Sequence, residues 1–157
     1  MTSGEASDCV LRSEGGEIIC VIEGYERESA LSDSDANWLS VDATVRKDNF
    51  KGNANISLTT YDLARLAEEL RLLLSGSVAQ ACLDTDEQAL SITIALRQTG
   101  TGEVVGTLRD PLNPGVSVTA KFGVDRANIE EFLSAVDATL QRFPVRAQQG
   151  REPGNAP

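Results

Sequence analysis

The 157-residue chain contains no histidine. Histidine is the commonest general base in enzymes, the partner of serine and cysteine nucleophiles, and the commonest metal ligand. The patterns G-x-x-x-x-G-K-[ST], G-x-S-x-G and H-E-x-x-H are absent as well. We therefore expect a protein that is not an enzyme, with no catalytic or metal-binding residues and no cofactor.

Cysteine and aromatic residues are also scarce. The three cysteines, Cys9, Cys20 and Cys82, are widely spaced and form no C-x-x-C pair, which argues against a zinc knuckle or a redox pair. Cys20 and Cys82 lie in apolar runs, where a free cysteine behaves as a small buried hydrophobic residue. Aromatic residues make up only 4% of the chain, so we expect a core of Val, Ile, Leu and Ala.

Long apolar runs and basic leader segments are missing too. No run approaches the roughly 20 apolar residues that a membrane-spanning helix needs, and no basic stretch followed by an apolar run opens the chain. The sequence therefore predicts a cytoplasmic protein that makes no membrane contact.

The charge is strongly one-sided. There are 24 acidic against 14 basic residues, giving a net charge of −10, and 11 of the acids but only four of the bases fall within residues 1–50. Nucleic acids and anionic lipids both require a basic surface, so we expect neither as a partner. An acidic surface suits a basic partner protein, although solubility alone would also explain it.

Two acidic clusters resemble the start of a calcium loop but do not complete it. An EF-hand loop needs glycine at its sixth position and glutamate at its twelfth. The loop that would begin at Asp33 has Trp38 and Thr44 there, and the loop that would begin at Asp84 has Ala89 and Ala95. Both clusters are interpreted as solvated turns. The stretch GTGEVVG at 100–106 is interpreted as a hairpin turn, because its third glycine comes one residue late for a dinucleotide loop.

Hydrophobic periodicity predicts an α+β domain. Alternating apolar residues indicate strands near 17–25, 39–46, 53–59, 78–83, 90–96, 104–108 and 116–124. Spacings of three and four indicate helices at 61–75, capped by Thr60, and from about Asp125 onwards. We expect an antiparallel β-sheet of six or seven strands, arranged as two meanders, with both amphipathic helices packed on one face. The domain should span 17–143, between a flexible lead-in (1–16) and a disordered tail (144–157).

This arrangement leaves the other sheet face to small polar side chains. It forms either a solvated surface or a platform for protein contacts, made of Ser40, Thr44, Asn53, Asn55, Ser57, Ser91, Thr93, Ser117 and Thr119. Trp38, the only tryptophan, precedes Leu39 and by alternation belongs to this face, either as a structural residue or as an anchor for a partner. The candidate partner-binding residues are Asp33, Asp35, Asn37, Trp38, Asp84, Asp86 and Glu87.

Four stretches together resemble a known family: DANWLSVDATV, FKGNANISLTTYDLARLAEELRLLL, EQALSITIALRQTGTGEVVGTLRDP and KFGVDRANIEEFLSAVDATL. The chain over about residues 35–143 is similar to the WapI family of immunity proteins. The pair Asn37-Trp38 and the G-x-L-x-x-P stretch from Gly106 to Pro111 are its most distinctive features. The closing helix departs from the family pattern, because VDRANIEEF stands where an acidic residue and a glutamine are usual.

The resemblance implies a non-catalytic protein that binds and blocks a cognate toxin. The acidic charge would suit a nuclease toxin, whose phosphate site attracts acidic groups, and a toxin of another class is equally open. Two alternatives remain. One is an accessory or scaffolding domain that uses the polar sheet face. The other is a hydrolase that relies on carboxylates, for which Asp84, Asp86 and Glu87 are the least implausible set.

Overall fold

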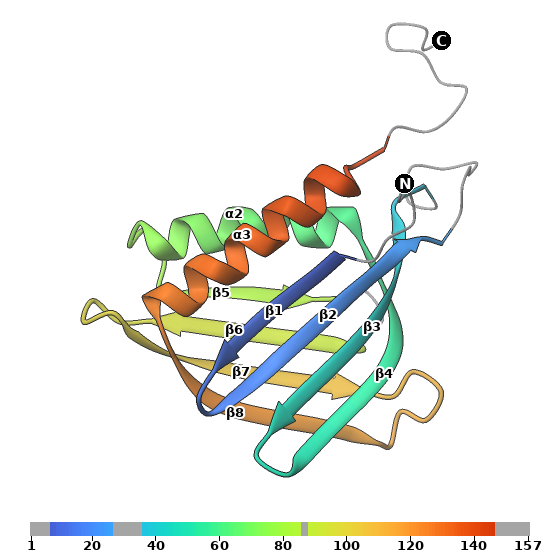
Figure 1. The fold of residues 1–157 in the computed structure, drawn as a ribbon, viewed down its shortest axis with the longest axis horizontal. Helices are drawn as coiled ribbons and strands as arrows, with labels where there is room; N and C mark the ends of the chain where they lie inside the picture. Colours follow the sequence, from blue (N-terminus) through green and yellow to red (C-terminus); the bar gives the residue numbers. More distant parts are fainter. Residues whose placement is uncertain (1–6, 27–35, 86–87, 147–157) are drawn as a thin grey trace, which may run out of the picture.

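The computed structural model describes residues 7–26, 36–85 and 88–146. It confirms the α+β class, with two helices and with eight strands instead of six or seven (Figure 1). The elements are β1 (Ser7–Ser13), β2 (Gly16–Tyr25), β3 (Trp38–Lys47), β4 (Phe50–Thr59), α2 (Thr60–Leu74), β5 (Gln80–Asp84), β6 (Leu90–Leu96), β7 (Thr101–Arg109), β8 (Ser117–Asp125) and α3 (Arg126–Arg142). Each half of the chain is thus a four-stranded meander followed by one helix.

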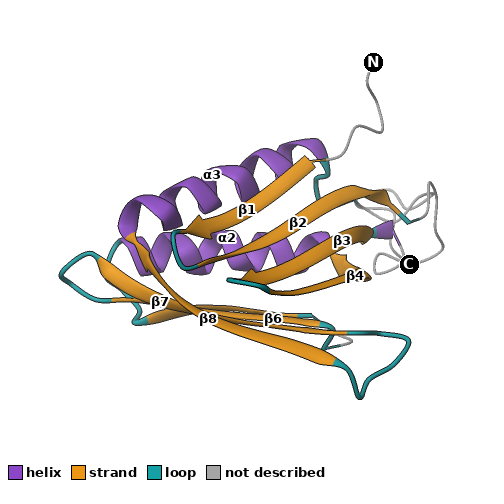
Figure 2. Ribbon diagram, turned by 60° about the horizontal axis from the view of Figure 1, so that its bottom comes forward, coloured by secondary structure: helices purple, strands orange, loops and turns teal. Residues whose placement is uncertain are grey.

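The two meanders form two separate antiparallel sheets, in the orders β1-β2-β3-β4 and β5-β6-β7-β8. The strands of one sheet cross those of the other, and the apolar faces of the two sheets turn towards each other (Figures 1 and 2). β3 packs on β7 and β8, and β4 packs on the same two strands. The inner faces of the two sheets therefore pack partly on one another, whereas the sequence predicted a single sheet that holds both meanders and is covered by helices.

Each helix packs mainly on the first strand of the other half. α2 lies against β5, α3 lies against β1, and the two helices contact each other. The Glu69 side chain accepts a hydrogen bond from the Cys82 backbone N–H at 2.8 Å, and the Cys9 thiol lies 3.2 Å from the Thr139 hydroxyl. The helices thereby cover the β1 and β5 margins and leave the outer faces of both sheets open.

Capping boxes start both helices. Thr59 and Asp62 exchange side-chain-to-backbone hydrogen bonds at the start of α2, and Asp125 and Asn128 do the same at the start of α3. Such caps satisfy N–H groups that have no partner within the helix. Asp125 was predicted correctly. The cap of α2 is Thr59 and not Thr60, because the Thr60 hydroxyl donates to the Asn37 side chain instead, at 2.7 Å.

Two glycines allow the sheets to approach closely. A Cβ at Gly106 would lie 2.5 Å from Cδ1 of Ile18, and one at Gly52 would lie 2.9 Å from a methyl carbon of Val118. Gly52 sits in the unbroken register of β4, opposite Val45, and its small size makes room for β8.

The segment boundaries differ from expectation at three places. β1 lies within 1–16, where a flexible lead-in was predicted, and pairs along its whole length with β2. The hairpin turn predicted within 100–106 falls at 97–100, where Gly100 has a φ of 91°. Pro144 to Arg146, assigned by sequence to the tail, contact the body of the domain.

No helix in the described part of the chain is long and apolar enough to cross a membrane.

Candidate protein-binding face

The structure describes three of the seven candidate partner-binding residues, and they lie on two different sheets. Asn37 and Trp38 are at the start of β3, and Asp84 is exposed at the end of β5. Asp33, Asp35, Asp86 and Glu87 lie outside the described residues. The described candidates therefore do not form one site.

Asn37 is fully buried, and its side chain is used within the fold. Its amide nitrogen donates to the Arg146 carbonyl at 2.9 Å, and its amide oxygen accepts from the Arg146 N–H at 2.7 Å. Its backbone carbonyl also accepts from the N–H of Thr60 at 2.9 Å. The asparagine of the Asn37-Trp38 pair thus joins three segments of the chain.

Trp38 is half-buried, whereas the next residue, Leu39, is fully buried. Because side chains alternate along a strand, Trp38 lies on the outer face of the β1–β4 sheet, the side predicted from the sequence. Its backbone carbonyl accepts from the Glu26 N–H at 2.9 Å, which places it beside the end of β2.

The small polar residues divide between the outer faces of two sheets and do not form one broad surface. The β1–β4 sheet carries Ser40, Thr44, Asn53, Asn55 and Ser57, and the β5–β8 sheet carries Ser91, Thr93, Ser117 and Thr119. The Thr107 and Thr119 hydroxyls of the second sheet lie 2.9 Å apart and partner each other. On the first sheet the Asn53 amide likewise donates to the Thr44 hydroxyl, at 2.9 Å, but most of the polar residues also bond to carboxylates.

Carboxylates accept hydrogen bonds from the polar residues of the first sheet. Glu23 accepts from the Ser40 hydroxyl at 3.0 Å and from the Asn55 amide at 3.2 Å. Asp42 accepts from the Asn53 amide at 3.0 Å, and Glu26 accepts from the Ser57 hydroxyl. Glu23 reaches this face because β2 bulges between Ile22 and Gly24. All of these donors are neutral, so the negative charges are held in place without being neutralised.

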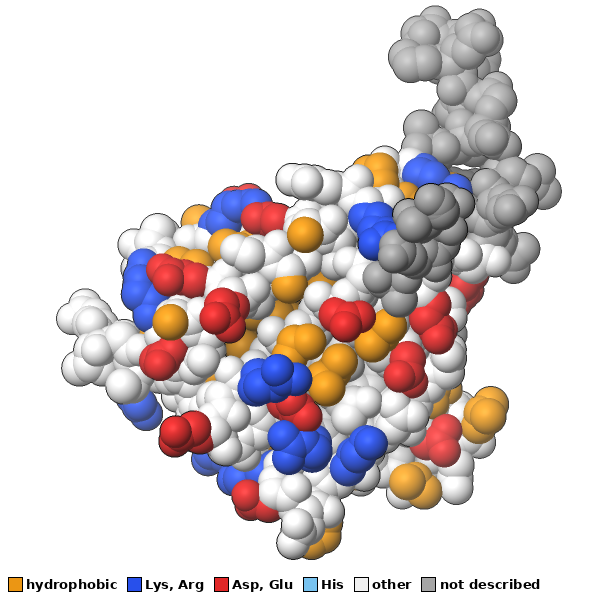
Figure 3. All heavy atoms as spheres, viewed as in Figure 1, with side chains coloured by type: hydrophobic (Ala, Val, Ile, Leu, Met, Phe, Trp, Pro, Cys, Tyr) orange, Lys and Arg blue, Asp and Glu red, His pale blue; other side chains and the backbone are white. Residues whose placement is uncertain are grey.

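A half-buried apolar group adjoins these carboxylates. Val10 pairs with Ile19 across β1 and β2, and the neighbouring row runs Asp8, Val21, Asp42. We define the acidic face by its outward-facing acidic, apolar and aromatic residues: Asp8, Val10, Ile19, Val21, Glu23, Glu26, Trp38 and Asp42. Figure 3, which views this side of the molecule, shows hydrophobic side chains gathered in the middle, with acidic side chains beside them and basic ones below.

The opposite end of the same sheet is basic and internally paired. Glu17 accepts a hydrogen bond from Arg12 and one from Arg46, both at 2.7 Å. These bonds, of which the one from Arg46 has the larger effect, hold the pKa of the Glu17 carboxyl below its usual value. The sheet therefore has one basic end, one acidic end and an apolar centre.

The outer face of the β5–β8 sheet is more balanced. Glu103 on β7 forms an ion pair with Lys121 on β8 at 3.7 Å. In the strand register, Lys121 stands opposite Val105. Glu103 thus has a cation beside it, in contrast to Glu23, Glu26 and Asp42, while Asp84, at the end of β5, makes no ion pair with the described residues.

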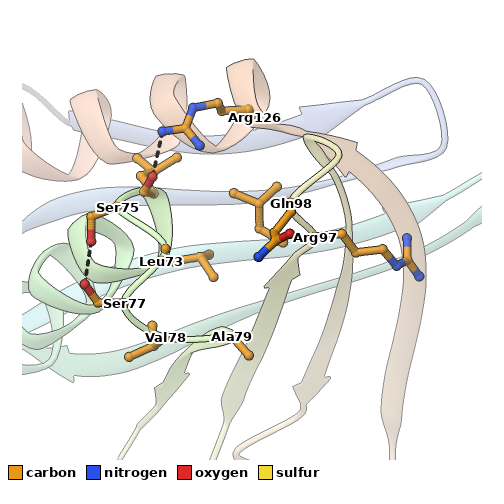
Figure 4. A pocket seen from close by; sticks show the side chains of 11 residues that line it. Leu73, Ser75, Ser77, Val78, Ala79, Arg97, Gln98 and Arg126 are labelled. Carbon is orange, nitrogen blue, oxygen red and sulfur yellow. Dashed lines mark hydrogen bonds between the residues drawn. The ribbon is translucent and has the colours of Figure 1, made fainter.

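A hollow of about 570 Å³ lies where α2 ends, bordered by the turn after β6 and the start of α3 (Figure 4). Arg126 donates to the Leu74 carbonyl at 2.6 Å, and the Ser75 and Ser77 hydroxyls lie 2.9 Å apart. The Arg97 guanidinium points away from the two serines. The residues that line the hollow include no Asp, Glu or Cys, so it lacks the acid pair that a hydrolase without histidine would use.

Cysteine chemistry and metal binding find little support among the described residues. Burial raises the pKa of the Cys9 thiol to about 11 and raises that of Cys20 as well, so both are held as unreactive thiols. Within 7–26, 36–85 and 88–146, no three Cys, Asp or Glu side chains are grouped to hold a metal ion.

The chain is similar to several solved structures. The crystal structure of WHY1 from Arabidopsis thaliana has 11% sequence identity and a TM-score of 0.50, covering 88% of this chain and 90% of that one. The crystal structures of MRP1/MRP2 from Trypanosoma brucei give 13% and 0.46, covering 87% and 83%. A guide-RNA-binding protein complex bound to a guide RNA gives 13% and 0.46, covering 87% and 89%. At these identities only the likeness of fold with WHY1 is informative.

No curated protein sequence matches the chain. A family model matches the chain over residues 9–144, which is nearly the whole of the described structure. The matched span includes β2 to α3 completely and all but two residues of β1. The chain therefore belongs to the immunity protein WapI-like family.

Proposed function

We propose that this protein is a non-catalytic immunity protein that neutralises a cognate toxin by direct protein–protein contact. The observation that carries the proposal is the family match over residues 9–144. Immunity proteins of this kind act by binding, and binding needs a stable surface and no reaction chemistry. The absence of histidine and the unreactive buried thiols agree with such a role.

The negative charge of the chain supports a basic protein partner. A net charge of −10 opposes binding to nucleic acid or to anionic lipid. The same charge accelerates the encounter with a positively charged protein. A toxin that acts on nucleic acid carries such a surface at its substrate site, and an acidic inhibitor can cover it.

The proposal is tested by producing the protein together with the toxin domain encoded beside its gene. Growth should be restored, and the two proteins should elute as one complex in size-exclusion chromatography. A matched control replaces this protein with another acidic protein of similar size, which should not rescue growth. A toxin that kills equally in the presence of this protein and forms no complex with it would refute the proposal.

A further inference from the structure

We propose that the acidic face is the surface that binds the toxin, and that the toxin meets it with Lys and Arg side chains arranged around an apolar contact. This inference rests on the function proposed above and assigns it to one side of the molecule. It follows from which surfaces the fold leaves open, from the distribution of charge and from the position of the apolar residues.

The fold buries most apolar side chains, and the large hydrophobic side chains that stay exposed lie off the acidic face, mostly at or beside turns, as Phe50, Leu112 and Val116 do. The inner faces of the two sheets bury each other, and the helices cover the margins formed by β1 and β5. What remains open is the pair of outer sheet faces and the outward sides of the helices. A flat sheet face of ten-residue strands such as β2 and β3 offers a broad, rigid platform for a partner protein.

Charge distinguishes the two outer sheet faces. On the acidic face, Glu23, Glu26 and Asp42 accept hydrogen bonds only from hydroxyl or amide groups of the described residues. An ionised carboxylate has about four acceptor positions, so each can still accept bonds from an incoming cation. On the other outer face, Glu103 already lies beside Lys121. Charge complementarity therefore assigns a basic partner to the first face.

The apolar residues supply the second component of an interface. Val10, Ile19 and Val21 are half-buried on the outer side of β1 and β2, and Val21 lies between Asp8 and Asp42 in the register. Trp38, also half-buried, lies on the same side. Binding energy in protein interfaces is concentrated in a few residues, most often Trp, Tyr and Arg, so Trp38 is the candidate anchor and the aliphatic side chains add complementary surface. Charged groups at the rim set orientation and association rate.

The carboxylates are also held in fixed positions before any partner arrives. The Glu23 side chain spans β3 and reaches Asn55 on β4, and Asp42 is fixed by its neighbour Asn53. Side chains ordered in advance lose less conformational entropy on binding. This property suits an inhibitor that must bind its target tightly.

The test uses isothermal titration calorimetry with the neighbour-encoded toxin domain, carrying an inactivating substitution, as the probe. The variant Glu23→Lys/Asp42→Lys reverses two charges on the acidic face. The matched control Glu68→Lys/Glu131→Lys makes the same change in net charge at exposed positions on α2 and α3. Circular dichroism and urea midpoints establish that both variants fold.

We expect the dissociation constant to rise by roughly 100-fold or more for the acidic-face variant, and by less than about threefold for the helix control. Equal weakening by both variants would mean that only net charge matters and would overturn the assignment, as would wild-type affinity in the acidic-face variant. If the wild-type protein fails to bind the toxin domain, the proposed function falls, and the assignment of this face falls with it.

Discussion

The side-chain amide of Asn37 binds the backbone of Arg146 on both sides, donating to its carbonyl at 2.9 Å and accepting from its N–H at 2.7 Å. The guanidinium of Arg146 in turn lies 3.6 Å from the centre of the Tyr25 ring and donates to the Ala36 carbonyl. The Tyr25 hydroxyl donates to the Pro144 carbonyl at 2.5 Å. The segment Pro144–Arg146 therefore fastens the end of β2 to the start of β3, immediately before Trp38.

Removing Pro144–Arg146 and their contacts should destabilise the protein. A chain ending at Phe143 should have an unfolding free energy about 3 kcal/mol lower than a chain ending at Arg146, because several part-buried hydrogen bonds and one cation–π contact are lost. Comparing two truncated chains isolates the contribution of Pro144–Arg146. Within the full chain, Arg146→Lys should not restore what Arg146→Ala loses, because an ammonium cannot make the same forked, stacked contact. Equal midpoints for the two truncated chains would contradict this reading.

Glu17 should make the protein more stable at neutral pH than in acid. Hydrogen bonds from Arg46 and Arg12 place its folded-state pKa below the usual value, so its contribution is complete above the unfolded-state pKa and is lost as pH falls through the folded-state pKa. Glu17→Gln should therefore cost about 1 kcal/mol at pH 7. The difference from wild type should shrink as pH falls from 7 towards 3, which urea unfolding over that range will measure. A pH-independent difference would point to packing and not to charge.

Gly102 should tolerate no side chain, whereas its neighbour Gly123 should. A Cβ at Gly102 would overlap the carbonyl oxygen of Ala95 on the paired strand β6, while one at Gly123 would come no closer than 3.8 Å to the Gly102 oxygen. Gly102→Ala should lower the unfolding free energy by about 2 kcal/mol, as overpacking does. Gly123→Ala should stay within about 0.5 kcal/mol of wild type, and thermal melts distinguish the two.

Trp38→Ala should weaken toxin binding more than it weakens the fold. The side chain is half-buried on the acidic face, so its loss should raise the dissociation constant at least tenfold, as is usual for a tryptophan at the centre of an interface. The far-ultraviolet circular dichroism spectrum should be unchanged. If the variant unfolds, Trp38 is a structural residue, and the conservative variant Trp38→Phe then shows by its affinity whether the aromatic surface also contacts the partner.

Much of the fold could be predicted because local pattern and tertiary structure agree. The alternation from Leu39 to Val45 and the helical stripe of Leu63, Leu66, Leu70 and Leu73 both face the core as expected. β1 was missed because its run SDCVLRS is short and polar apart from three residues. The division into two sheets was missed because alternation shows which side of a strand is apolar, and not whether a helix or another sheet covers it.

The candidate site was predicted only in part, for physical reasons. Alternation along β3 predicted the sheet face on which Trp38 lies, and Asp42 could have been assigned to that face in the same way. Glu23 could not, because a bulge in β2 breaks the period of two. Asn37 was assigned to partner contacts, whereas its burial depends on Thr60 and Arg146, which are distant in sequence. Long-range hydrogen bonds of this kind leave no local signal.

In the complex, the toxin should cover the acidic face. Carbodiimide labelling of carboxyl groups, read by mass spectrometry with and without the toxin domain, measures this residue by residue. We expect labelling of Asp8, Glu23 and Asp42 to fall at least severalfold in the complex, while labelling of Glu103 and Glu131 stays unchanged. Protection of Glu103 or Glu131, with Glu23 and Asp42 still labelled as in the free protein, would contradict it.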